Sequence, residues 1–406
     1  MIPVAEALNH VKTNLKTLEA EEVILEDCLG RVLAEDAASN LSHPPVAVSS
    51  MDGYAVQAQD VADVPATLNV IGESQAGGGY DGVVGAGQAV RIFTGAPLPD
   101  GADAIVIQEN TESSEGVVKV LESVESGVFI RPAGLDFSEG DVLLTAATVL
   151  TSRHIGLAAA MNLPSLKVRR KPRIAIMATG DEVVMPGQPV GPSQIISSNT
   201  FSLVTFVRAM GGEPVNVGIA SDTMESLNET LDKALGCDLL VTIGGASVGD
   251  YDLVGTLLDD NGLERIFYKI AMRPGKPLLF GKLGGRFGDM GVLGMPGNPV
   301  STAVCSVLFL RPAIMALLGL DATEDTQTAR LGCDLKPNDM RQDYLRASLE
   351  SVDGGLVATP FNKQDSAMQA RMAVADCLII RAPEAPAAKA GDVVSILRLG
   401  GALVSV

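Results

Sequence analysis

The pattern of apolar and polar positions changes character twice along the chain, and the first region ends near residue 170. Within it, short apolar runs alternate with glycine-rich turns, as in AGGGYDGVVGAGQAVRI and PAGLDFSEGDVL, which is typical of β-rich or barrel-like domains. The N-terminus differs, because apolar residues recur there at helical spacing. It predicts an amphipathic helix that packs against a later segment, with one face formed by Val4, Leu8, Val11, Leu15 and Leu18.

From KPRIAIMATGDEVV onward, apolar runs of strand length alternate with segments of helical length. This pattern predicts strands at 173–178, 214–219, 238–243 and MGVLGM, helices near 200–210, at 223–235 and after PGNP, and a hairpin within 265–283. Alternating strands and helices are typical of a doubly wound parallel sheet. After about residue 325 the chain is again β-rich: DYLRASLESVDGGLVATPF predicts a hairpin, and CLIIRAP and GDVVSILRL predict two later strands.

The chain of 406 residues is long enough for two to four domains. Its net charge of −19 argues against a nucleic-acid-binding protein, which needs a basic face, but allows a small anion held by a few cations. The most apolar stretch, 301–320, has Arg311 and Pro312 at its middle. We therefore expect a buried helix that is broken at Pro312 and no membrane span.

The cysteines and the N-terminus suggest a cellular location. The five cysteines lie far apart with no C-x-x-C pair, which favours a reducing compartment over a disulfide framework. The N-terminus lacks the basic region and cleavage site of a secretory signal, so we expect a cytoplasmic protein. None of the three histidines has H-E-x-x-H spacing, so zinc is not expected, whereas a hard cation on carboxylates stays open.

Three loops directly follow predicted strands of the α/β region, namely TGDE, GGASVGDYD and MPGNP. Ligands of doubly wound sheets bind at the carboxyl ends of the strands, so we expect these loops to share one pocket. In the middle loop, Gly244, Gly245 and Gly249 allow close backbone approach to an anion, and Ser247 can donate its hydroxyl. An ordinary strand-to-helix turn explains the same glycines equally well.

Two further segments carry features that attract anions. In RPGK, Arg273 and Lys276 flank a proline-glycine turn, and two cations on a rigid turn can clamp a phosphate or another oxyanion. A solvated hairpin tip would have the same composition. In MPGNPV, Asn298 is a predicted N-cap and Pro299 lies in the first helical turn, where the helix dipole attracts negative charge.

Acidic residues are the remaining candidates. Single acids are mostly surface turn residues, but several here follow strands of one predicted sheet: Asp181, Glu182, Asp222, Asp250 and Asp252. Carboxylates there can hold Mg²⁺ between phosphate oxygens, or accept hydrogen bonds from a base with adjacent N–H and NH₂ groups. A ligand that combines a phosphate with a guanine-like edge would use the backbone N–H groups and the carboxylates together.

Seven motifs occur in the order SSMDGYAV, RIFTGAPLPDGADAIV, IRPAGLDF, MATGDEVV, LVTIGGASVGDYD, RPGKPLLFG and GMPGNPVS. Together they resemble the molybdopterin molybdenumtransferases, the MoeA family that includes the E domain of gephyrin, over nearly the whole chain. The resemblance implies a four-part, L-shaped chain that forms an elongated homodimer. We expect an N-terminal linker and dimer domain (1–40 and 141–170), a β-rich second domain (41–140), an α/β molybdopterin-binding domain (171–322) and a C-terminal β-barrel-like domain (323–406).

The resemblance also implies a reaction. Enzymes of this family take adenylylated molybdopterin and molybdate, with Mg²⁺, and yield molybdenum cofactor and AMP, and transient contact with other enzymes of cofactor biosynthesis would follow. Carried over by motif, the catalytic residues are Asp52, Thr94, Asp136, Glu182, Asp222 and Asp252, of which Glu182, Asp222 and Asp252 would hold Mg²⁺. The substrate-binding residues are Gly244, Gly245, Ser247, Gly249, Arg273, Lys276, Pro296, Asn298, Pro299, Arg346 and Ser366. Two positions depart from the family pattern: Arg273 replaces a common lysine, and Ile243 a small hydroxyl residue.

Two other interpretations stay open. A related α/β domain adenylylates molybdopterin and shares the TIGGxSxG-type loop, but SSMDGYAV and FTGAPLPDGADAIV resemble the metal-inserting enzymes. A non-catalytic scaffold of the same fold would not need the acids, all of which are present in this chain.

Overall fold

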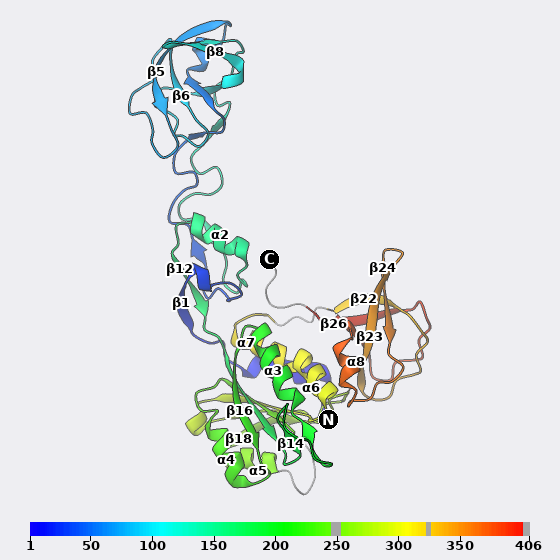
Figure 1. Ribbon diagram of the computed structural model, residues 1–406. Helices are drawn as coiled ribbons and strands as arrows, with labels where there is room; N and C mark the ends of the chain where they lie inside the picture. Colours follow the sequence, from blue (N-terminus) through cyan, green and yellow to red (C-terminus); the bar gives the residue numbers. More distant parts are fainter. Residues whose placement is uncertain (245–252, 322–325, 401–406) are drawn as a thin grey trace.

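The computed structural model of the chain describes residues 1–244, 253–321 and 326–400. Figure 1 shows an elongated molecule with a small β domain at one end and the α/β and C-terminal domains at the other, joined by a slender connecting domain. The expected multidomain architecture, with β-rich domains on both sides of a central α/β domain, is thereby confirmed.

The distal β domain is built on a six-stranded sheet in the order β7-β4-β6-β5-β9-β8. Its strands are β4 (Gly53–Val56), β5 (Ala66–Ser74), β6 (Gln88–Ile92), β7 (Ala104–Ile107), β8 (Thr111–Ser114) and β9 (Val117–Val120). Side chains of β4, which lies between β7 and β6, alternate between two apolar clusters: Tyr54 and Val56 belong to one cluster and Ala55 to the other. Two short strands that flank these six in the sequence, β3 (Val48–Ser49) and β10 (Ile130–Arg131), pair with each other in a separate ladder.

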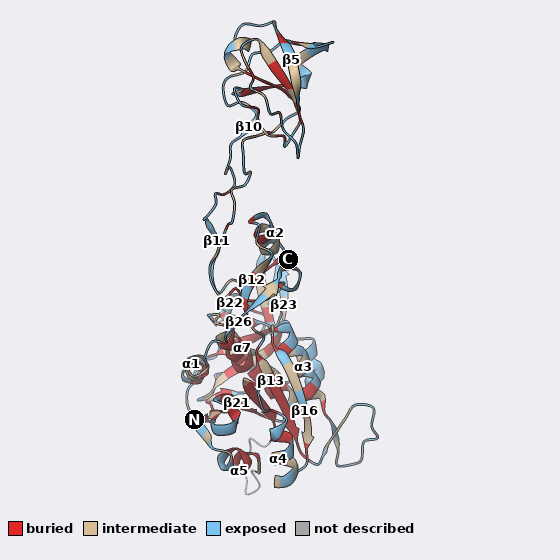
Figure 2. Ribbon diagram, turned by 90° about the vertical axis from the view of Figure 1, so that its left-hand side faces the viewer, coloured by how far each residue is buried: buried red, intermediate tan, exposed pale blue. Residues whose placement is uncertain are grey.

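The connecting domain is assembled from chain segments on both sides of the distal domain. Strand β1 (Ala20–Ile24) pairs with β12 (Ser165–Arg169), and β2 (Ala37–Ala38) with β11 (Val142–Leu144), in both cases antiparallel. Helix α2 (Ser152–Ala160) completes it. The distal domain is therefore an insertion between paired strands, and Figure 2 shows the largely exposed chain near β11 that leads to it.

The α/β domain holds a six-stranded sheet in the order β16-β13-β17-β21-β20-β18. Its strands are β13 (Arg173–Thr179), β16 (Glu213–Ala220), β17 (Leu239–Ile243), β18 (Leu263–Tyr268), β20 (Leu279–Leu283) and β21 (Met290–Met295). The first four strands of the order are parallel, as predicted. Strands β20 and β18 run antiparallel and supply the hairpin predicted within 265–283, so the sheet is mixed and not wholly parallel.

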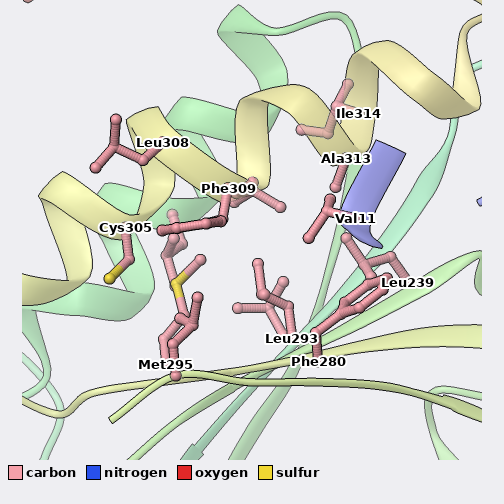
Figure 3. Close-up of a cluster of buried hydrophobic side chains, with 14 of the residues drawn as sticks. Val11, Leu239, Phe280, Leu293, Met295, Cys305, Leu308, Phe309, Ala313 and Ile314 are labelled. Carbon is pink, nitrogen blue, oxygen red and sulfur yellow. The ribbon is translucent and has the colours of Figure 1, made fainter. Parts of the chain in front are cut away.

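Helices cover both faces of this sheet. Successive residues of each central strand point to opposite faces, so each of these strands packs against both layers of helices. Ile174 and Ile176 of β13 pack under α1 (Val4–Asn14), α3 (Ser198–Ala209), α6 (Pro299–Cys305) and α7 (Arg311–Leu317). Ala175 and Met177 pack under α4 (Met224–Asp232) and α5 (Leu253–Asp260). In Figure 3, Phe309 and Ile314 of the long helical run lie above Leu293 and Phe280 of the sheet, with Val11 of α1 nearby. The predicted packing of the N-terminal helix is confirmed.

The predicted break at Pro312 is wrong. A π turn at Ser306–Leu310 joins α6 to α7, so Pro299–Leu317 is one helical run. Pro312 lies in the first turn of α7, and the π turn before it absorbs the change in hydrogen-bond pattern. Among the described residues, this one helix is long and apolar enough to cross a membrane, yet 72% of its most apolar window is buried within the protein, as in a core helix.

The C-terminal domain is a small curled sheet, which confirms the predicted β-rich character. Its elements are β22 (Thr326–Leu331), β23 (Gln342–Val352), β24 (Gly355–Pro360), β25 (Cys377–Arg381), β26 (Val393–Arg398) and the short helix α8 (Gln369–Ala373). Strand β23 pairs with both β24 and β25, which closes the sheet into a barrel-like ring. Strand β19 (Met272–Arg273), which comes from the α/β domain, adds to it by pairing with β23.

Candidate functional site

A pocket of about 330 Å³ opens at the carboxyl ends of the central strands of the α/β domain. Its lining includes residues that directly follow or end three of these strands: Thr179, Glu182, Ile243, Gly244, Gly297, Asn298 and Pro299. The described parts of the three loops therefore meet in one pocket, as predicted. Gly245, Ser247, Gly249, Asp250 and Asp252 lie outside the described residues.

Gly244 stands where the chain turns away from β17. Its φ of 86° lies in the left-handed region, and a Cβ there would lie 3.2 Å from Oγ1 of Thr179. Its N–H donates to the carbonyl of Met295 at 3.1 Å, which joins the ends of β17 and β21. The backbone conformation therefore favours glycine, a Cβ would fit only tightly, and Gly244 lines the pocket at this point.

A second wall of the pocket was missed by sequence reasoning. It consists of β14 (Val183–Val184), which pairs in parallel with β15 (Ile195–Ile196), and of the start of α3. The buried hydroxyls of Ser197 and Thr200 lie 2.9 Å apart, and Nδ2 of Asn199 donates to the carbonyl of Gly297 at 2.7 Å. The run SSNT, just before the helix predicted near 200–210, was the signal for this polar wall.

The start of α6 forms the third wall. Asn298 occupies the N-cap position, as predicted, although within the described chain its side chain makes no capping hydrogen bond. The hydroxyl of Thr302 donates to the carbonyl of Pro296 at 2.6 Å, which fixes the MPGNP loop against the helix. The N–H of Val300 donates to the carbonyl of Ser366 at 3.1 Å, and the adjacent Ala367 lines the pocket. The C-terminal domain thus contributes to the pocket.

Three of the acids singled out in the sequence, Asp181, Glu182 and Asp222, lie at this edge of the sheet. Glu182 lines the pocket, and the exposed Asp222 follows β16, where its N–H donates to Oδ1 of Asp181 at 3.2 Å. Within the described residues, no three Asp, Glu, His or Cys side chains are grouped as a metal site. Mg²⁺ usually takes one or two carboxylates and completes its shell with phosphate oxygens and water, so the oxygen donors present fit this ion.

Asp52 and Thr94 lie together in the distal domain. The backbone N–H and the hydroxyl of Thr94 both donate to Oδ1 of Asp52, at 2.7 and 2.8 Å. Both bonds lower the pKa of Asp52 because they stabilise its charged form, and the backbone bond has the larger effect. Asp136 is exposed on another loop of the N-terminal half, where its N–H donates to the carbonyl of His43 at 3.0 Å. In Figure 1 the distal domain lies at the opposite end of the molecule from the α/β domain, whose pocket Glu182 lines, so one chain does not bring Asp52 and Glu182 together.

The two cations of the RPGK turn, Arg273 and Lys276, have different surroundings. Arg273 donates to Asp339 at 3.1 Å and also pairs with the buried Asp343, so its guanidinium is engaged by the C-terminal domain. Arg273 and Asp343 line a second pocket of about 370 Å³ in that domain. Lys276 is exposed. Gly275 between them has a φ of 107°, and a Cβ there would lie 2.7 Å from Sγ of Cys305, so the turn packs directly on α6.

The two residues predicted in the C-terminal domain have different surroundings. Ser366 is half-buried against the start of α6. Arg346 on β23 is 1% exposed and bonds to the side chain of Gln364 and the carbonyl of Met368. Ser366 therefore lies beside the pocket, whereas the guanidinium of Arg346 is inside the C-terminal domain.

Comparison with protein families matches three parts of the chain. The MoeA N-terminal region (domain I and II) matches residues 2–162, a probable molybdopterin binding domain matches 175–316, and the MoeA C-terminal region (domain IV) matches 328–399. The matches follow one another along the chain in this order.

Individual relatives resemble the chain over most of its length. A molybdopterin molybdenumtransferase of Nostoc sp. is 38% identical over 343 residues, which cover 83% of this chain and 78% of that protein. One of Bacillus subtilis is 35% identical over 391 residues, which cover 93% and 90%. A solved MoeA protein from Pyrococcus horikosii superposes with a TM-score of 0.87 at 30% identity, covering 99% of this chain and 100% of that one.

Proposed function

Because the chain belongs to the MoeA family of molybdopterin molybdenumtransferases, we propose that it inserts molybdenum from molybdate into adenylylated molybdopterin and releases AMP. The observation that carries the proposal is the pocket at the ends of β13, β17 and β21, where backbone, hydroxyl and carboxylate groups converge. Such a pocket suits a ligand with a pterin edge and phosphates, because it offers hydrogen-bond acceptors for the first and backbone N–H donors for the second.

The residues divide between recognition and chemistry. Glu182 would accept hydrogen bonds from the pterin, and the loop Gly244, Gly245, Ser247 and Gly249 would hold phosphate oxygens with backbone and hydroxyl donors. Pro296, Asn298 and Pro299 would shape the floor of the pocket, and Lys276 and Ser366 would attract the oxyanion at its edge. Arg273 would act through the C-terminal domain that it engages.

Mg²⁺ would be held by Asp222 and Asp252 with a contribution from Glu182, and it would neutralise charge on the phosphoanhydride that is cleaved. The residues themselves orient the anhydride for cleavage. Asp52, Thr94 and Asp136 would complete the site from the distal domain, with Asp52 ionised and oriented by Thr94.

We further propose that the chain works as a homodimer in which the distal domain of one protomer faces the α/β pocket of the other. The separation of Asp52 from the pocket within one chain supports this arrangement. A cytoplasmic location and transient contact with other enzymes of molybdenum cofactor biosynthesis fit a small-molecule product that must be passed on. All five cysteines are free, which suits a reducing compartment.

One assay tests the proposed reaction. The protein is incubated with adenylylated molybdopterin, Mg²⁺ and molybdate, and AMP is measured against a reaction without molybdate. Molybdate-dependent AMP release is expected. Consumption of ATP with unmodified molybdopterin, and no AMP from the adenylylated form, would instead indicate an adenylyltransferase. Inertness in both reactions would indicate a scaffold.

A further inference from the structure

One short segment of the C-terminal domain, residues 364–368, reaches the α/β pocket. Ala367 lines the pocket together with Asn298 and Pro299. The preceding residue, Ser366, accepts a hydrogen bond from the N–H of Val300 through its carbonyl at 3.1 Å. This bond joins two domains at the first turn of α6, so the position of the segment sets the shape of that wall.

Arg346 holds both ends of this segment from inside the C-terminal domain. Its Nε donates to Oε1 of Gln364 at 3.2 Å, and its Nη1 donates to the carbonyl of Met368 at 3.3 Å. Gln364 in turn donates from Nε2 to the carbonyls of Arg346 and Phe361, both at 2.9 Å. Ser366 and Ala367 therefore lie between two residues that are both hydrogen-bonded to Arg346, namely Gln364 and Met368.

The burial of Arg346 costs free energy, and the contact with the segment 364–368 offers a reason for it. The side chain is among the largest fully buried ones, and within the described chain its Nη2 has no hydrogen-bond partner. Desolvation lowers its pKa, and the charge of Asp365 opposes this. A buried, incompletely satisfied guanidinium is less favourable than an apolar side chain of similar size, so stability alone does not account for arginine here.

We propose that Arg346 is a positioning residue: it holds the segment 364–368 against α6 and so places the wall of the pocket, without touching the substrate. The activity readout of this proposal rests on the proposed function, whereas its structural readout does not.

The structural test is amide exchange at Val300 in the full chain without substrate. Arg346→Met removes the charge and keeps much of the volume, and the neutral Gln364→Ala removes the anchor from the other side. Both are expected to speed exchange at Val300 by about tenfold or more, because the bond to Ser366 opens more often. Arg346→Lys keeps the charge but cannot span Gln364 and Met368, so it should behave like Arg346→Met. Arg330→Met, which removes an exposed arginine of β22, is the matched control and should leave exchange unchanged.

The kinetic test separates positioning from direct contact with the oxyanion. Gln364→Ala and Arg346→Lys should raise KM for adenylylated molybdopterin about tenfold and leave KM for molybdate unchanged, since a displaced wall affects the ligand that fills the pocket. If Gln364→Ala left both Val300 exchange and that KM at wild-type values, the proposal would be wrong, even if Arg346→Met failed to fold. The proposal would also be overturned if Arg346→Lys behaved like the wild type while Arg346→Met changed KM for molybdate. That pair of results would indicate that the charge of Arg346 acts on the anion. If the wild-type chain released no AMP, the exchange measurement would still decide.

Discussion

Asp52 shows how neighbouring groups stabilise the charge of a single half-buried carboxylate. Both donors of Thr94 act on Oδ1, and they lower the pKa of Asp52 in the folded chain. Because the folded-state pKa lies below the unfolded one, these bonds stabilise the fold above the unfolded pKa, and their contribution is lost as pH falls through the folded pKa. Asp52 is therefore ionised throughout the neutral range, with one oxygen held and oriented.

Removing one of these donors should raise the pKa of Asp52. Thr94→Val deletes the hydroxyl and retains the backbone N–H, so we expect the pKa to rise part of the way toward its ordinary value and any acid limb of AMP release to move to higher pH. Carboxyl-carbon NMR titration measures this. Thr94→Ser keeps both donors and should titrate like the wild type; equal pKa values in Thr94→Val and wild type would show that the hydroxyl has no such effect.

Arg273 and Lys276 are both exposed cations of the RPGK turn, and Arg273 is engaged in ion pairs with Asp339 and Asp343. Lys276→Ala should weaken binding of molybdate, the oxyanion that Lys276 would attract, by about 1.5 kcal/mol at low salt, the lower end for a charged hydrogen bond, because water screens an exposed group. Calorimetry at two ionic strengths should show the loss shrinking as salt rises. Lys389→Ala, an exposed lysine paired with Asp334 in the C-terminal domain, is the control. An unchanged Kd at low salt would mean that the turn is only a solvated hairpin tip.

At the scale of elements, α6 is located by contacts from three directions. The MPGNP loop is bonded to Thr302, the segment 364–368 is bonded to Val300, and the RPGK turn packs on Cys305. The π turn after α6 lets the helix continue past Pro312 and cover the sheet. The position of α6 thus depends on the turn that packs on its last residue as well as on the contacts at its start.

Gly275→Ala tests this dependence. A methyl group there would meet Sγ of Cys305 at 2.7 Å in a backbone conformation that alanine disfavours, so we expect the free energy of unfolding to fall by about 2–4 kcal/mol. Urea unfolding measures the change. Gly284→Ala has nothing within 4 Å of its Cβ and should lose less than about 1 kcal/mol. Equal losses at both positions would show that α6 does not depend on the RPGK turn.

At the scale of the whole molecule, the distal domain is held far from the α/β pocket by the slender connecting domain. Strand pairs β1–β12 and β2–β11 join the outgoing and returning chain, so this separation is built into the fold. A site that needs Asp52 as well as the pocket must then be completed by a second chain, as a two-fold dimer allows.

Mixed dimers test the shared site. Asp52→Ala and Asp252→Ala chains should each be inactive in AMP release. After dissociation and reassembly of an equal mixture, about half of the dimers contain one of each chain, and each has one site with both lesions and one with neither. We therefore expect about a quarter of wild-type activity to return. Subunit exchange is verified with mass-tagged chains. Complete exchange without recovered activity would show that each site is built within one chain.

The elements predicted correctly are those whose signal is local. Strands β13, β17 and β21 are short apolar runs closed by glycine or polar loops, and α1 has a regular apolar face, so neighbouring residues are enough to define them. The convergence of TGDE and MPGNP on one pocket also followed from sequence, because parallel strands place their carboxyl ends at one edge.

The sequence by itself therefore determined the central strands of the α/β domain, the N-terminal helix, the glycine at the end of β17 and the family motifs, since each depends on residues close together in the chain. Only the tertiary structure decided that the hairpin of β18 and β20 joins the parallel strands antiparallel to β21, that Arg273 pairs with Asp339 and Asp343, and that Arg346 lies buried behind the segment that borders the pocket. It also placed Asp52 at the far end of the molecule from Glu182. The side-chain partners in these contacts lie 18 to 70 residues apart. The free energy that selects them comes from burial and hydrogen bonding across the fold, which no local pattern contains.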